Sequence, residues 1–125
     1  MKKSLTPLGE TEMEVLHHVW ELGEATVKDV QQRILESREV AYTTIMTVMK
    51  NLADKGYLQY RKDGVTYVYS PAQEPDNVRF NLVSDLVKKV FKGSPMELVQ
   101  TLVKSEELSD EERDEIRKMI DKMED

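Results

Sequence analysis

The most regular pattern of apolar and polar positions lies between residues 42 and 56. Four apolar residues follow the i, i+3, i+4, i+7 spacing of one helix face: Ile45, Val48, Met49 and Leu52. The opposite side carries Thr43, Thr47, Lys50 and Asp54. Gly56 is expected to end this helix, because glycine readily adopts positive φ. The spacing therefore predicts a helix with one buried face and one polar face.

A β-hairpin is predicted directly after this helix. Residues 57–62 and 65–70 are rich in Tyr and Val, and Asp63-Gly64 stands between them. An Asp-Gly pair between two strand-like runs is a strong short-range hairpin signal. A helix with a polar outer face followed by a hairpin is the layout of a winged helix-turn-helix.

Two further helices are predicted upstream, over residues 9–22 and 26–35. Their expected inner faces are Val15, Leu16, Val19 and Leu22 in the first and Val27, Val30, Ile34 and Leu35 in the second. Gly23 separates them, and Thr26 with Asp29 forms a start signal for the second helix. In a winged helix of this order, the third helix enters the DNA major groove.

The pattern changes after Pro71. Residues 73–76 are expected to form a linker, and the helix after them carries apolar residues at 3-4-3 spacing: Phe80, Val83, Val87 and Val90. Capping signals at Ser94 and Ser109 predict two more amphipathic helices, which contain Leu102, Ile116 and Ile120. These helices are too small for a core of their own, so these seven residues are the predicted dimerisation surface. The alternative is that the helices fold back onto the N-terminal domain.

The expected fold is therefore mainly α with a small β-hairpin. It comprises a winged-helix domain, residues 1–72, and a helical dimerisation domain, residues 73–125. No apolar run of 18 residues and no signal peptide is present, which favours a soluble cytoplasmic protein without membrane contact. The chain has no cysteine, so disulfides and thiolate metal sites are excluded.

The net charge of −6 is unusual for a nucleic-acid binder, but it is unevenly distributed. Residues 1–72 carry nine Lys/Arg and ten Asp/Glu, whereas residues 73–125 carry nine and fourteen. Residues 40–62 hold Lys50, Lys55, Arg61 and Lys62 against Asp54. Because salt screens charges more than about 8 Å apart, this local basic patch matters more for docking than the total charge does.

Candidate catalytic chemistry is missing from the sequence. The five glycines are isolated, so no phosphate-binding loop is present. His17 and His18 are adjacent and diverge by about 100° on a helix, which prevents a shared metal site. We therefore expect no enzyme activity, no cofactor and no metal.

The outer face of helix 42–56 is the candidate binding site, because Thr hydroxyl and methyl groups can contact base edges and phosphates. The candidates there are Tyr42, Thr43, Thr44, Met46, Thr47 and Lys50, with Arg61 and Lys62 expected on phosphates. Two alternatives remain. The outer threonines have no function, or the winged helix is a protein-interaction module without DNA contact, which the acidic balance favours.

Three motifs are similar to those of the BlaI/MecI/CopY family of bacterial repressors: Glu14-Val-Leu-x-x-x-Trp20, the stretch from Ala41 to Gly56, and Tyr67-x-Tyr69. The resemblance implies a homodimeric repressor of a palindromic double-stranded DNA operator, with Thr43, Thr44, Met46 and Thr47 facing bases. Family members often carry a basic residue at position 43 or 46, so the operator sequence is left open. The regulated genes are open as well.

The resemblance does not define the inducing signal. The copper-responsive branch of the family uses a cysteine-rich tail, which this chain lacks. In the β-lactam branch a protease cuts near an Asn-Phe pair, and Thr101-Leu102 stands at the equivalent place here. A regulatory protease acting on the C-terminal region is therefore a candidate partner, although the usual cleavage pair is absent.

Overall fold

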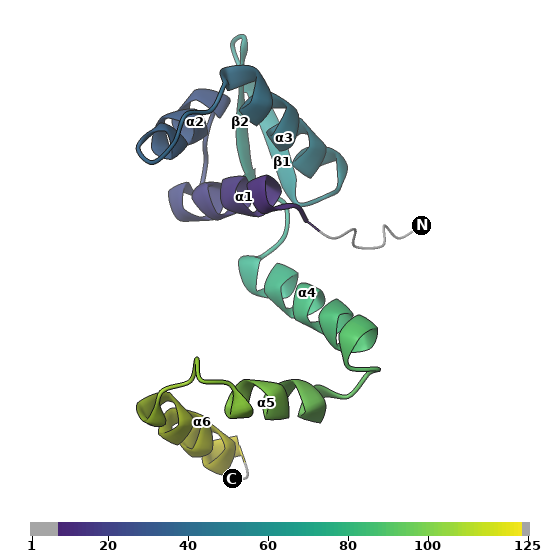
Figure 1. Cartoon of the computed structure of the whole chain (residues 1–125). Coiled ribbons are helices and arrows are strands. Elements are labelled where there is room, and N and C mark those ends of the chain that lie inside the picture. The colour runs from purple at the N-terminus through teal and green to yellow at the C-terminus, as the bar shows by residue number, and fades with distance from the viewer. Residues whose placement is uncertain (1–7, 124–125) are drawn as a thin grey trace. The chain divides into compact units, whose positions relative to one another are not determined.

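The computed structural model describes residues 8–123 (Figure 1). This part of the chain forms six helices and one two-stranded antiparallel hairpin, which confirms the predicted fold class. In chain order the elements are α1 Glu10–Leu22, α2 Val27–Leu35, α3 Tyr42–Asp54, β1 Leu58–Asp63, β2 Thr66–Pro71, α4 Pro75–Val90, α5 Pro95–Lys104 and α6 Asp110–Met123.

The chain divides into two compact units, and the division falls inside α4, between Leu82 and Val83. We call the described residues 8–82 the winged-helix unit and residues 83–123 the C-terminal unit. The first residue of the predicted linker contacts the winged-helix unit: Gln73 Nε2 donates a hydrogen bond to the Gly56 carbonyl at 2.9 Å. The first turns of α4 continue the winged-helix unit, because Val78 of α4 is buried in its core.

Local sequence signals set the ends of the first three helices. Glu12 accepts a hydrogen bond from the Gly9 backbone N–H at the start of α1, and Gly23 ends that helix with a φ of 82°. At the start of α2, Thr26 and Asp29 accept hydrogen bonds from each other's backbone N–H. These reciprocal bonds satisfy N–H groups that the helix itself leaves without partners.

The hairpin is tightly registered. Leu58 pairs with Pro71 and Asp63 pairs with Thr66, while Gly64 in the turn has a φ of 67°, which favours glycine. Ala25, in the connection between α1 and α2, forms a further antiparallel bridge with Tyr69. Strand β2 therefore lies between β1 and the α1–α2 connection.

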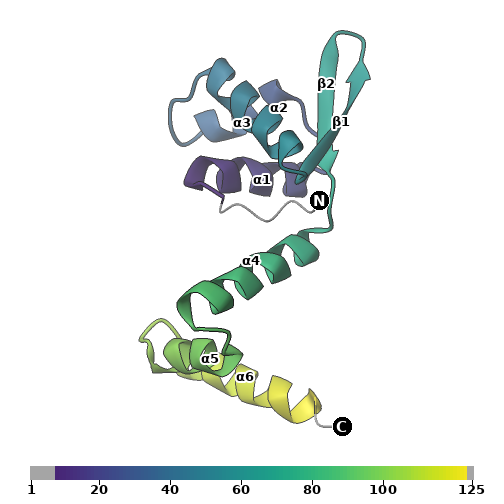
Figure 2. The ribbon, with the colours of Figure 1, turned by 90° about the vertical axis from the view of Figure 1, so that its right-hand side faces the viewer.

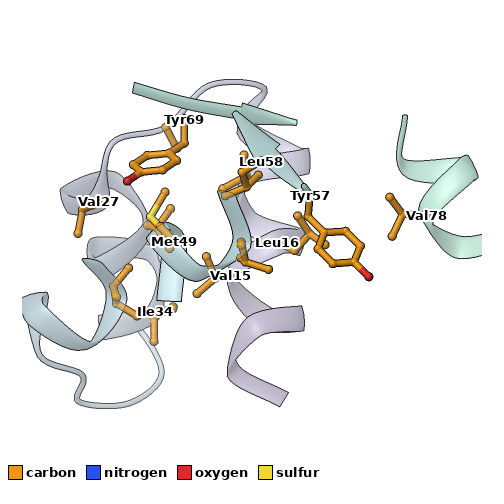
Figure 3. Close-up of a cluster of buried hydrophobic side chains, with 14 residues drawn as sticks. Val15, Leu16, Val27, Ile34, Met49, Tyr57, Leu58, Tyr69 and Val78 are labelled. Atoms are coloured by element: carbon orange, nitrogen blue, oxygen red, sulfur yellow. The ribbon is translucent and has the colours of Figure 1, made fainter. Parts of the chain in front are cut away.

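The core of the winged-helix unit collects apolar side chains from its helices and hairpin (Figure 3). Buried members include Leu16 of α1, Ile34 of α2, Met49 of α3 and Tyr69 of β2, and Val78 joins them from α4. Two predicted core residues are exposed instead, Leu22 and Leu35. Each is the last residue of its helix, and its side chain is not covered by the core.

The C-terminal unit is built differently. Ser94 caps α5 by accepting from the Glu97 N–H, and Ser109 caps α6 in the same way through Glu112, as the sequence predicts. No residue of α5 or α6, over the ranges given above, is buried in the single chain. None of the described helices is long and apolar enough to cross a membrane.

Candidate nucleic-acid interface

The outer face of α3 is open to solvent along its length. Ile45, Met49 and Leu52 are fully buried on the inner face, and this fixes the rotation of the helix. The candidate residues on the other side are all exposed: Tyr42, Thr43, Thr44, Met46, Thr47 and Lys50. Within residues 8–123, the side chains of the three threonines have no hydrogen-bond partner. Packing therefore does not account for this set of side chains.

The first turn of α3 and the turn of the hairpin lie at the same end of the winged-helix unit in both views (Figure 1 and Figure 2). At the tip, Val65 is 97% exposed. A helix and a hairpin turn that project at one end can contact one duplex together. The winged-helix unit alone thus supplies two candidate contact elements at one end, the first turn of α3 and the hairpin turn.

The two predicted phosphate contacts of the hairpin, Arg61 and Lys62, are neighbours on β1, so their side chains point to opposite faces of the sheet. Lys62 pairs directly with Tyr67, and its Nζ lies 5.8 Å from the centre of that ring. Tyr60 and Tyr69 share this face, and the Tyr60 ring lies 4.9 Å from Tyr67 and 5.5 Å from Tyr69, centre to centre. Because Tyr69 is buried in the core, Lys62 lies on the core-facing side of the hairpin.

Arg61 lies on the other face of the hairpin, where it forms an ion pair with Glu24. Its Nη2 donates to Oε1 of Glu24 at 3.2 Å, and both side chains are more than half exposed, 57% and 58%. The hydrogen bond and the charge of Glu24 raise the pKa of the Arg61 guanidinium above its ordinary value. In the free protein, Arg61 is thus a paired cation.

Lys55, counted in the basic patch by sequence, is also paired. Its Nζ donates to both carboxylate oxygens of Glu12, at 3.0 and 2.9 Å, across the contact between α3 and α1. The side chains are 30% and 16% exposed, respectively. Burial opposes ionisation of Glu12, but the hydrogen bonds from Lys55 and from the Gly9 N–H prevail and lower the pKa of the carboxyl. The basic patch available to a ligand is therefore smaller than the local charge count suggests.

The predicted dimerisation residues are largely solvent-accessible in the single chain. Five of the seven are exposed: Phe80, Val83, Val90, Leu102 and Ile120. Ile116 is half-buried, and Val87 is only 8% exposed. Val87 therefore already packs within its own chain, which leaves it little surface to offer a partner.

Sequence reasoning missed three residues of this region. Two of them, Tyr60 and Tyr67, form an exposed aromatic pair beside Lys62. Strict alternation along the strands could have predicted that both tyrosines lie on the same face as Lys62. The third is Glu24. No sequence pattern predicts its position beside Arg61, because that position depends on the bridge between Ala25 and Tyr69.

Comparison with known proteins adds relatives over nearly the whole chain. The profile of a family described as penicillinase repressor matches residues 8–122. The transcriptional regulator BlaI of Mycobacterium tuberculosis is 31% identical over 122 residues, covering 96% of this chain and 87% of that protein. The methicillin resistance regulatory protein MecI of Mammaliicoccus sciuri is 27% identical over 115 residues, covering 92% and 94%.

Two solved structures resemble part of the chain. One is the DNA binding domain of the repressor BlaI, with a TM-score of 0.53. The other is the monomeric form of Bacillus licheniformis BlaI in complex with the blaP half-operator, with a TM-score of 0.50. Each is 26% identical and covers 62% of this chain and 93% of its own.

Proposed function

The chain belongs to the penicillinase repressor family, a family of transcriptional repressors rather than enzymes, and we propose that it binds a palindromic operator as a homodimer. The outer face of α3 is the observation that carries this proposal. It presents hydroxyl and thioether side chains that have no hydrogen-bond partner among residues 8–123, at the end of the unit where the hairpin turn also projects. The related BlaI binds a half-operator in its monomeric form, which supports one winged helix per half-site.

Base contacts in this proposal come from the first turns of α3. Thr43, Thr44, Met46 and Thr47 would enter the major groove, with Tyr42 at its edge. A Thr side chain can hydrogen-bond to a base edge through its hydroxyl and contact a thymine methyl through its own methyl. Such contacts read sequence, whereas contacts to phosphate only position the protein.

Phosphate contacts come from Lys50 and Lys62, with Arg61 as a third cation. Lys50 lies on the exposed side of α3, and Lys62 lies on the hairpin beside Tyr67. Lys55 is left out, because the carboxylate of Glu12 already binds its ammonium group. A small number of phosphate contacts per subunit predicts moderate salt dependence and makes binding depend on two half-sites.

The C-terminal unit would pair two copies of the chain. Its helices expose apolar side chains that no described part of the chain covers: Val90, Met96, Val99, Leu102, Val103, Met119, Ile120 and Met123. Two of these helices, α5 and α6, have no buried residues in the single chain. Exposed apolar surface of this kind favours a protein–protein interface. A second copy fits, because a two-fold dimer matches the symmetry of a palindromic operator.

We extend the proposal to two finer points. Since its proposed target is operator DNA, we place the protein in the cytoplasm. A regulatory protease would act at Thr101-Leu102, which is exposed on α5. The Thr101 hydroxyl donates to the Glu97 carbonyl within that helix, so cleavage requires local unwinding of α5. A cut there would separate α6 from the winged-helix unit and weaken pairing.

Selection of bound fragments from random duplex DNA tests the proposed function. We expect enrichment of a palindrome whose half-sites are about 10 base pairs apart, or a multiple of this, because each half-site presents the same groove to one α3. A chain in which Thr43, Thr44 and Thr47 are all replaced by Ala is the matched control and should enrich no palindrome. Absence of any enriched sequence with the unaltered chain would contradict operator recognition.

A further inference from the structure

Four cations that residues 8–61 contribute to the winged-helix unit form ion pairs with carboxylates of the same unit. Glu21 pairs with Arg33, Glu14 with Arg38, Glu12 with Lys55 and Glu24 with Arg61. Of these four cations, Arg61 belongs to the hairpin and Lys55 follows the last residue of α3. Lys55 is partly buried with its partner, whereas Arg61 and Glu24 are both accessible to a ligand.

The sheet brings Glu24 to Arg61. Arg61 is opposite Val68 on β2, and Ala25 is bridged to Tyr69, the next residue of that strand. Glu24, directly before Ala25, therefore reaches the same face of the sheet as Arg61, on the far side of β2. The pair thus bridges the α1–α2 connection and β1 across β2, with the Arg61 guanidinium 3.2 Å from the Glu24 carboxylate on the outer face of the hairpin.

A phosphate that approaches Arg61 meets a competing anion. Duplex DNA carries one negative charge for about each 1.7 Å of its axis, and a guanidinium binds phosphate and carboxylate with the same fork of donors. Glu24 would also lie well within the screening distance of about 8 Å from any phosphate bound to Arg61. The two anions thus compete for one cation and repel each other.

We propose that Glu24 is a built-in competitor of operator DNA, which holds Arg61 in the free protein and must release it when Arg61 contacts a backbone phosphate. This inference rests on the proposed function, since it requires the hairpin to approach DNA. Glu24 sets the strength and salt dependence of binding without touching a base. Its carboxylate limits sequence-independent affinity and thereby increases the relative weight of the base contacts of α3.

Titration of a mixed-sequence duplex at several salt concentrations tests the inference. Glu24→Gln should tighten binding at low salt by roughly 1.4- to 5-fold per subunit, the range for release from one exposed ion pair. The slope of log K against log salt should steepen by about 0.9 per subunit. In the unaltered chain Arg61 and Glu24 together bring no net charge to the DNA, whereas in the Glu24→Gln chain the guanidinium charge fully neutralises one phosphate, and that phosphate releases its condensed counterion.

Glu21→Gln is the matched control. It removes the same charge from an exposed pair of the same unit, but its partner Arg33 belongs to α2 rather than to α3 or the hairpin. In an Arg61→Ala background, Glu24→Gln should give a clearly smaller gain, because only the direct repulsion between Glu24 and the DNA is then relieved. Equal gains from the Glu24 and Glu21 substitutions, or a Glu24 gain of undiminished size without Arg61, would overturn the inference while leaving DNA binding intact. If the unaltered chain binds no duplex at any salt concentration, the proposed function fails and this inference fails with it.

Discussion

Replacement of Glu12 by Gln removes one of the few partly buried ion pairs in the described chain. Lys55 Nζ lies within 3.0 Å of both Glu12 oxygens, and the pair joins the first turn of α1 to the residue after α3. Gln can still accept from the Gly9 N–H, as residues at this position of a capping box do. The substitution therefore isolates the contact with Lys55.

The expected loss lies between two limits. Exposed ion pairs contribute about 0.2–1 kcal/mol, whereas hydrogen bonds to charged groups contribute about 1.5–3 kcal/mol. With Glu12 16% exposed and Lys55 30% exposed, we expect a loss of about 1–2 kcal/mol in the free energy of unfolding at pH 7. Glu10→Gln is the control, because Glu10 is an exposed residue of the same helical turn, and it should change stability by less than about 0.5 kcal/mol.

The pH dependence has a definite sign. The pKa of Glu12 is lowered below its ordinary value of 4.5, so its ionised form is stabilised by folding. The advantage of the unaltered chain over the Gln variant should be complete above about pH 4.5 and disappear as the pH falls through the lower folded pKa. Urea unfolding at equal protein concentrations measures both quantities. Equal stability at pH 7, or a difference that persists in acid, would refute this reasoning.

Two other predictions concern assembly and phosphate contact. Leu102→Asp together with Ile120→Asp should convert a micromolar dimer to monomer in sedimentation, because both side chains are exposed in the single chain; an unaltered chain that sediments as a monomer would contradict dimerisation. Val87→Asp is unsuitable for that test, since Val87 is already buried within its own chain. Lys62→Ala should weaken binding to all duplexes alike and reduce the salt slope by about 0.9 per subunit, whereas an unchanged slope would exclude Lys62 from the phosphates.

The winged-helix fold was predictable because its signals are local. The apolar stripe of α3, the Thr26 cap and the Asp63-Gly64 turn each act within a few residues, and each is found where the sequence places it. The ends of the apolar stripes were less predictable. Leu22 and Leu35 continue the helical spacing, but each lies beyond the region where its helix meets another element.

Electrostatic partners were the part that sequence could not supply. Glu12 and Lys55 are 43 residues apart, and they meet only because α1 packs against α3. The pairing of Arg61 with Glu24 likewise requires the strand bridge at Ala25. The base-facing roles of the α3 side chains and the dimerisation roles of the C-terminal residues stay predictions, because they depend on partners outside the single chain.

Recognition of DNA by α3 is tested most directly through Thr47. Its side chain is exposed and without a hydrogen-bond partner among residues 8–123, so Thr47→Ala should change helix stability by less than about 0.7 kcal/mol. Gln32→Ala, an exposed position on α2, is the matched control and should leave DNA binding unchanged.

The decisive measurement is the affinity of the unaltered chain and of Thr47→Ala for a selected operator and its single-base variants. We expect the Thr47→Ala chain to lose roughly 1–3 kcal/mol on the operator and to discriminate less at one base pair of each half-site. If both chains bind with equal affinities and rank the variants identically, Thr47 reads no base. This result would contradict the proposal that the outer face of α3 recognises the operator through Thr47.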